Sequence, residues 1–265
     1  MSSVAEFLIE RLNSSGVKHV FGVPGVELQS FYSILFNEED IELINITNEN
    51  NAGFAADAYA RVNGIGAVCV SYNGALKIAN AVACAYAERS PLIVISLSPD
   101  IKENTGYIKT LFDNITCASV TLDNPASAGY EIDKAFESLK HNKQPIYIEL
   151  PKDVANKSVE YNVYKFGTPQ SPATDSYNLD EVLEEVSTWL DHSDQPVILA
   201  GVEIARFCLD EKLIKFAEKK SIPIVTTLLS KSVIDETHYL FGGIYQGEAS
   251  KPETKFLVDE SDCLL

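Results

Sequence analysis

The first 150 residues alternate short, almost wholly apolar runs with longer stretches of helical periodicity. Short apolar runs separated by helices are typical of parallel strands, because helices cover both faces of such a sheet. The pattern therefore predicts an α/β fold, with a doubly wound parallel sheet that is complete within residues 1–150. The predicted strands are 20–23, 41–46, 67–71, 92–97, 119–122 and 145–150, and the predicted helices are 3–15, 27–36, 50–62, 75–88 and 126–141.

The composition changes after residue 150. Residues 151–178 contain proline, serine, threonine and asparagine with weak periodicity, which predicts an interdomain linker. A second α/β pattern occupies residues 179–265, and a third strand is expected to start within 261–265. We therefore expect an incomplete second α/β domain, either because the sequence is a fragment or because another element completes the sheet. Its predicted helices are 179–190, 208–220 and 251–260, and its predicted strands are 196–200 and 223–227.

Composition and charge exclude several classes of partner. The formal net charge is −17, whereas binding to nucleic acids or anionic membranes favours a basic surface. No apolar run reaches the length of a membrane span, and the N-terminal residues have helical periodicity instead of a signal-peptide pattern. The five cysteines are odd in number and form no C-x-x-C pair, which is typical of free thiols. These features predict a soluble, cytoplasmic protein.

A helix of small residues is predicted directly after the strand 41–46. The sequence NENNAGFAADAYAR, residues 48–61, places Glu49 in the first helical turn, ahead of several alanines and one glycine. The positive end of the helix dipole favours a carboxylate at that position, and so narrow a helix lets a ligand or another backbone approach closely. On physical grounds alone a structural role for Glu49 and a functional one both remain open.

Two further loops follow predicted strands. Residues 21–25, FGVPG, end in a proline–glycine turn, and residues 71–75, SYNGA, connect the third strand to the next helix. Open α/β sheets bind their ligands at such strand-to-helix loops, although a plain turn or connection would also explain each segment. The candidate ligand residues in and after these loops are Pro24, Gly25, Asn73, Gly74 and Asn80.

These segments together resemble the pyrimidine-binding domain of thiamine-diphosphate enzymes. In the second half, residues 231–236 (KSVIDE), 241–247 (FGGIYQG) and 250–252 (SKP) resemble the central domain of pyruvate, indolepyruvate and phenylpyruvate decarboxylases. The resemblance covers essentially the whole chain. It implies a thiamine-diphosphate-dependent lyase that decarboxylates a 2-keto acid, uses Mg²⁺, and forms a homodimer through its pyrimidine domains.

The resemblance also implies roles for individual residues. Glu49 matches the glutamate that hydrogen-bonds N1′ of the aminopyrimidine ring and promotes the imino form, which removes the thiazolium C2 proton. Glu49 is therefore the implied catalytic residue, and no residue is implied as a metal ligand. The implied cofactor-binding residues are Pro24, Gly25, Glu49, Asn73, Gly74 and Asn80.

The sequence departs from the family pattern at several places. Val26 stands where the decarboxylases commonly carry an aspartate, and Glu27 is the candidate replacement. None of the four histidines falls within residues 100–116, where the decarboxylases have a longer loop with a histidine pair. The sequence also contains no GDG…N segment, which binds diphosphate and Mg²⁺ in the family. We therefore expect little cofactor affinity and no turnover from this chain alone.

Other functions remain open beside the decarboxylase. A non-catalytic, degenerate paralogue that acts as a dimerisation or regulatory module is favoured by Val26 and disfavoured by the retained Glu49. Within the enzyme class, an acetolactate-synthase-like carboligase would share the glutamate and the fold. A generic flavodoxin-like nucleotide binder is disfavoured because the sequence has no phosphate-binding glycine loop.

Overall fold

The computed structural model of the protein describes residues 2–100, 107–159 and 176–265. It divides the chain into two compact units, Met1–Ser171 and Pro172–Leu265. Parts of the predicted loop 100–116 and of the predicted linker 151–178 therefore lie outside the described residues. Within the part of the chain that the structure describes, no helix is long and apolar enough to cross a membrane.

The first unit is built on a six-stranded sheet in the order β2-β1-β3-β4-β6-β5. Every pairing in this sheet is parallel. The predicted α/β class with a doubly wound parallel sheet is therefore confirmed. The strands are β1 (His19–Gly22), β2 (Glu42–Asn45), β3 (Gly66–Ser71), β4 (Leu92–Ser98), β5 (Ala118–Thr121) and β6 (Ile146–Pro151).

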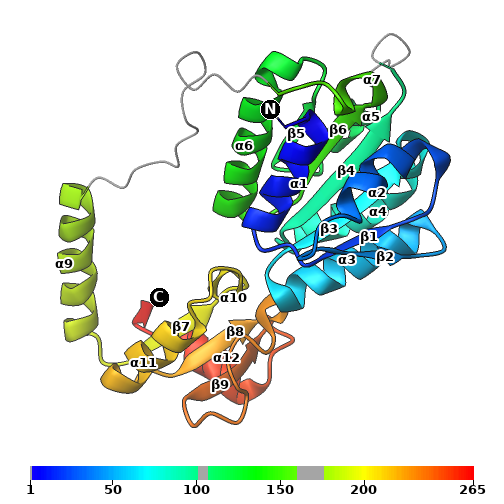
Figure 1. Ribbon diagram of the computed structural model, residues 1–265. Helices are drawn as coiled ribbons and strands as arrows, with labels where there is room; N and C mark the ends of the chain where they lie inside the picture. Colours follow the sequence, from blue (N-terminus) through cyan, green and yellow to red (C-terminus); the bar gives the residue numbers. More distant parts are fainter. Residues whose placement is uncertain (1, 101–106, 160–175) are drawn as a thin grey trace. The chain divides into compact units, whose positions relative to one another are not determined.

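Helices cover both faces of this sheet (Figure 1). The helices are α1 (Val4–Ser14), α2 (Gln29–Leu35), α3 (Glu49–Asn63), α4 (Tyr72–Ala87), α5 (Tyr107–Phe112), α6 (Pro125–Asn142) and α7 (Lys152–Ala155), and the 3₁₀ turn η1 (Val26–Leu28) precedes α2. Buried side chains of α1, α2 and α6 form a core on one face, and those of α3, α4 and α5 form a core on the other. Neighbouring strand residues such as Val68 and Cys69 thus enter different cores, which explains why the central strands β3 and β4 are almost wholly buried.

Local sequence signals set the ends of α3 and α4. The Asn48 side chain accepts a hydrogen bond from the Asn51 amide, which caps the N-terminus of α3. Gly64 ends the same helix with a left-handed φ of 85°, a conformation that glycine adopts without strain. The Ser71 side chain caps α4 by accepting from the Gly74 amide. The cap at Asn48 makes Glu49 the first residue of its helix.

The helices α3 and α4 pack closely because small residues face each other between them. A Cβ atom on Gly53 would lie 2.9 Å from Cβ of Ala81 and 3.2 Å from Cβ of Ile78. Ala52, Gly53, Ala56, Asp57 and Ala60 form the buried side of α3. Gly53 therefore serves the contact with α4, whereas Ala56 and Ala60 lie against Gly66 of β3.

The second unit contains a smaller parallel sheet of four strands in the order β10-β7-β8-β9. The strand start predicted within residues 261–265 is present as β10, which pairs with β7, whereas β9 is an additional strand that the sequence pattern does not predict. The strands are β7 (Pro196–Ala200), β8 (Ile224–Thr227), β9 (Phe241–Tyr245) and β10 (Cys263–Leu264), and the helices are α9 (Ser176–His192), α10 (Glu203–Arg206), α11 (Asp210–Lys220) and α12 (Pro252–Asp259), with the 3₁₀ turn η3 (Leu228–Ser230).

Two glycines, Gly242 and Gly243, make β9 difficult to predict from the sequence. A Cβ atom on Gly242 would lie 2.8 Å from Leu257 Cδ1, and one on Gly243 would lie 2.1 Å from Thr254 Oγ1. The Thr254 hydroxyl donates a hydrogen bond of 2.7 Å to the Gly242 carbonyl. Because α12 lies this close to the strand, β9 needs glycine where strand propensity would favour a larger residue.

Residues at both ends of the predicted linker have defined structure. Strand β6 extends to Pro151, and α7 follows it directly. The Val4 amide donates to the Lys157 carbonyl and the Val159 amide donates to the Ser2 carbonyl, each at 3.0 Å. Residues 151–159 thus pack on the first unit, and α9 starts three residues before the predicted helix. Helix α5 is likewise an element that the sequence pattern does not predict.

We predict that Gly53→Val lowers the free energy of unfolding of the first unit by about 1–3 kcal/mol, the usual cost of overpacking a close contact. The matched control is Ala58→Val, an exposed position on the same helix, which should cost about 0.5 kcal/mol through helix propensity alone. Urea denaturation followed by circular dichroism measures both. Equal losses for the two variants would contradict the close packing of α3 against α4.

Candidate functional site

The loops that carry the candidate residues leave the same edge of the first sheet. Strand β1 lies between β2 and β3, and Gly22 at its end is in register with Asn45 and with Cys69. The chain passes from β1 to α2 on one face of the sheet, and from β2 to α3 and from β3 to α4 on the other. This reversal is the topological switch point at which open α/β folds bind ligands.

Glu49 lies at this edge with its carboxylate largely covered. Its side chain is 16% exposed, and its Oε2 atom is 2.9 Å from Nζ of Lys77 on α4. The hydrogen bond from Lys77 is the main reason why the pKa of Glu49 is lowered below its ordinary value, against the opposing effect of burial. The structure therefore presents an ionised carboxylate at the N-terminus of α3.

Gly74 leaves the space that the Glu49 side chain occupies. A Cβ atom at Gly74 would lie 3.0 Å from Cγ and 3.2 Å from Oε1 of Glu49. Any larger residue at this position would press against the carboxylate. The two residues are 25 positions apart in the sequence, and the packing of α3 against α4 brings them into contact.

Tyr32 holds the loop after β1. Its hydroxyl donates to the carbonyls of Val23, at 3.3 Å, and Cys69, at 3.1 Å, and burial raises its pKa, so that the phenol keeps its proton. A Cβ atom on Gly22 would lie 2.2 Å from this hydroxyl, so glycine is required there. The turn that follows is consequently tied to β3.

Pro24 and Gly25 line a separate pocket of about 480 Å³. Among the described residues, neither Glu49 nor Gly74 lines it. The structure thus brings Glu49 and Gly74 together and places the proline–glycine turn at the same sheet edge beside its own pocket. The lining residues are Pro24, Gly25, Val26, Gln29, Tyr32, Ser33, Phe36, Leu43 and Asn45.

The other candidate residues are exposed. Asn73 and Asn80 lie on the solvent side of α4, in its first and third turns. Val26 is 88% exposed in η1, and Glu27 beside it is also exposed. Whether Glu27 replaces an aspartate at the position of Val26 therefore stays a prediction.

The histidines make contacts away from Glu49. The His19 Nδ1 atom lies 2.9 Å from the Tyr59 hydroxyl, and its Nε2 atom lies 3.5 Å from Glu42. His238 contacts Glu218 in the second unit. His141 and His192 are exposed at the ends of α6 and α9.

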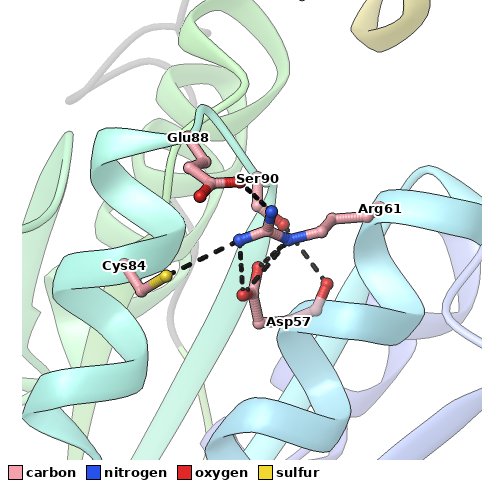
Figure 2. Close-up of polar contacts among 5 residues, drawn as sticks. All are labelled: Asp57, Arg61, Cys84, Glu88 and Ser90. Atoms are coloured by element: carbon pink, nitrogen blue, oxygen red, sulfur yellow. Dashed lines mark hydrogen bonds and ion pairs between the residues drawn. The ribbon is translucent and has the colours of Figure 1, made fainter. Parts of the chain in front are cut away.

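The opposite end of α3 is joined to α4 by a partly buried ionic network (Figure 2). Asp57 is only 4% exposed and accepts hydrogen bonds from Arg61 Nη2 at 2.8 Å and Nε at 3.2 Å. Arg61 also pairs with Glu88, the residue that follows α4, and lies 3.7 Å from Cys84 Sγ. The carboxylate of Asp57 raises the pKa of Arg61, so this charge is permanent. Ion pairs therefore join α3 to α4 at both ends.

Sequence reasoning misses Lys77, Asp57, Arg61 and Glu88. Asp57 and Arg61 are four residues apart on α3, a spacing that favours an ion pair on any helix and could have been noticed. Lys77 carries no such signal, because it lies 28 residues from Glu49 and only the packing of α3 on α4 brings the two side chains together.

Comparison with protein families identifies both units. Residues 2–117 match the model of the thiamine pyrophosphate enzyme N-terminal TPP binding domain, and residues 183–265 match that of the thiamine pyrophosphate enzyme central domain. Glu49, Gly74 and Lys77 all lie within the first of these ranges.

Individual relatives match over nearly the whole chain. An indole-3-pyruvate decarboxylase of Azospirillum brasilense is 33% identical over 98% of the chain. A pyruvate decarboxylase of Candida albicans is 31% identical, and a putative pyruvate decarboxylase of Schizosaccharomyces pombe is 30% identical, each over 99% of the chain. The matches cover 50%, 50% and 49% of the respective relatives, so the chain spans about half of their length.

We predict that Arg61→Met lowers the free energy of unfolding of the first unit by about 2–4 kcal/mol, because it leaves the Asp57 carboxylate buried without its cation. Adding Asp57→Asn to this variant should recover part of the loss, since the buried charge is then removed. Urea denaturation measures both variants. A double variant less stable than Arg61→Met would show that the buried charge is not the cause.

Proposed function

Because this chain carries the N-terminal and central domains of thiamine pyrophosphate enzymes, we propose that its first unit binds the aminopyrimidine end of thiamine diphosphate through Glu49. We further propose that it belongs to a lyase that cleaves the bond between the carboxylate and the carbonyl carbon of a 2-keto acid. The relatives bear the names indole-3-pyruvate decarboxylase and pyruvate decarboxylase, which supports this substrate class.

The observation that carries the proposal is the Glu49 carboxylate against Gly74 at the switch point. A side chain that shares a proton with a ring nitrogen has to be held at a fixed position. Glu49 is held by the cap of α3 on one side and by α4 on the other. Most of its surface is covered, so water competes weakly for the carboxylate. The residues present therefore fit the pyrimidine end of the cofactor.

Thiamine diphosphate, when bound, supplies an electron sink for the charge that is left when carbon dioxide departs. The proposed role of this chain is to hold one proton between the Glu49 carboxylate and the ring nitrogen. An ionised Glu49 accepts a hydrogen bond from a protonated ring, and a protonated Glu49 donates one to a neutral ring. Gly74 leaves the room that the Glu49 side chain occupies in this arrangement.

The diphosphate and its Mg²⁺ need ligands of another kind. The sequence of 265 residues has no GDG…N segment, so we propose that this chain holds the pyrimidine end only and gives no turnover by itself. Pro24, Gly25, Asn73 and Asn80 remain proposed contacts at the same sheet edge. A rise of many degrees in the melting temperature on adding thiamine diphosphate with Mg²⁺ would contradict this restriction to the pyrimidine end.

Self-association through the first unit is also proposed. Phe54 on α3 is 40% exposed and Leu76 on α4 is 44% exposed, so the helices that bear Glu49 and Lys77 also present apolar side chains to solvent. A second copy would cover such side chains in a homodimer. Sedimentation equilibrium of the chain and of a Phe54→Asp, Leu76→Asp double variant would test this.

One observation favours a non-catalytic module as the second candidate. The exposed Val26 occupies the position where the resemblance implies an acid, and a valine has no proton to transfer. Such a module would keep the fold and the dimer without a need for Glu49. A carboligase of the acetolactate-synthase type would need Glu49 equally, and only its products would distinguish it from a decarboxylase.

We predict that Glu49→Gln weakens binding of the uncharged hydroxymethyl aminopyrimidine half of thiamine by about ten- to hundredfold, the worth of a charge-assisted hydrogen bond. Because this fragment binds weakly, the measurement is an NMR titration at millimolar concentrations. The matched control Glu27→Gln removes an exposed carboxylate of η1 and should bind like the wild type. Equal binding by wild type and Glu49→Gln, or none by the wild type, would refute the proposal.

A further inference from the structure

Lys77 covers the carboxylate that the proposed function requires. Its Nζ atom is 2.9 Å from Glu49 Oε2, and it lies on α4, three residues after the Gly74 that adjoins Cγ and Oε1 of the same carboxylate. Glu49 is therefore bounded by α4 at both oxygens. A ring nitrogen that approaches Oε2 of Glu49 meets an oxygen whose partner is already an ammonium group.

The two members of the pair differ in their freedom to move. The Lys77 side chain is 63% exposed, whereas that of Glu49 is 16% exposed and is held between two helices. A lysine head on a flexible four-carbon stem can swing into water at little cost. Because Glu49 is confined, the pair can open by movement of Lys77 alone.

We propose that Lys77 is a displaceable counter-ion of Glu49, which closes the site in the ligand-free protein and competes with an aminopyrimidine ring for the carboxylate. This inference rests on the proposed function, and it adds a regulation of the same site. Lys77 is a positioning residue in this role, since it acts on the ligand through Glu49.

The competition has a direct electrostatic basis. The bound state requires one proton shared between Glu49 and the ring nitrogen, and a cation beside the carboxylate lowers its affinity for that proton. Lys77 is the charged side chain among the described residues that lowers the pKa of Glu49. The nearest ion pair further along α3, that of Asp57 with Arg61, lies two turns from Glu49, and Arg61 is shared there with Glu88.

The test compares Lys77→Met with two other variants in the 265-residue chain. Lys77→Arg keeps a cation at the same place, and Lys140→Met removes an exposed lysine of α6 that pairs with Glu137 at 3.9 Å. Helix α6 ends at the opposite edge of the sheet, so Lys140→Met controls for the loss of one positive charge. The probe is the uncharged hydroxymethyl aminopyrimidine, whose binding does not respond to net charge directly.

We expect Lys77→Met to bind this probe about two- to fivefold more tightly than the wild type, since a partly exposed ion pair contributes about 0.4–1 kcal/mol. Lys77→Arg and Lys140→Met should bind like the wild type. In parallel, carbon NMR of the Glu49 carboxyl group should show its pKa rise towards the ordinary glutamate value in Lys77→Met alone. The stability that the pair contributes is present above that ordinary value and is lost as the pH falls through the lowered pKa.

The outcomes separate this inference from the proposed function. Binding that is lost in Glu49→Gln but equal in wild type and Lys77→Met would overturn the competition and leave the proposed function intact. An equal gain in Lys77→Met and Lys140→Met would also overturn it, because the effect would then be one of overall charge. If no variant binds the probe, the proposed function is wrong and this inference is wrong with it.

Discussion

The close contact between α3 and α4 is the constraint on which the candidate site depends. Gly53 lets the two helices approach until Ala81 and Ile78 fill the space where a side chain would stand. Only at that separation does Glu49, at the start of α3, lie against Gly74 in the first turn of α4. A helix axis moved by the width of one methyl group would separate the carboxylate from both Gly74 and Lys77.

Ionic contacts hold this pair of helices in register. At the far end, Arg61 lies between the buried Asp57 and Glu88, a residue just beyond α4 (Figure 2). At the near end, Glu49 pairs with the exposed Lys77. The two pairs differ in their physical character, because the first is buried and costly to break, whereas the second involves an exposed lysine. A rigid end and an adjustable end suit a helix whose first residue, Glu49, we propose to bind a ligand.

Much of the fold could be predicted because the relevant signals are local. The apolar runs placed the strands of the first unit close to where they lie, and the small-residue segment after the second strand did the same for the start of α3. Strand β9 could not be recognised, since Gly242 and Gly243 serve the approach of α12 and weaken the strand pattern. Residues 151–159 were predicted as linker because their backbone hydrogen bonds to Ser2 and Val4 join segments far apart in the sequence. Such bonds cannot be recognised from the local sequence.

The sequence by itself determined that the chain forms a parallel α/β sheet, that Glu49 stands at a helix N-terminus, and that glycine loops follow β1 and β3. These properties follow from periodicity and from the conformational preferences of single residues. Only the tertiary structure decided that Gly74 makes room for Glu49 and that Lys77 neutralises it. The physical reason is that these contacts join residues of two helices far apart in sequence, so their distances depend on how the helices pack and not on any local preference.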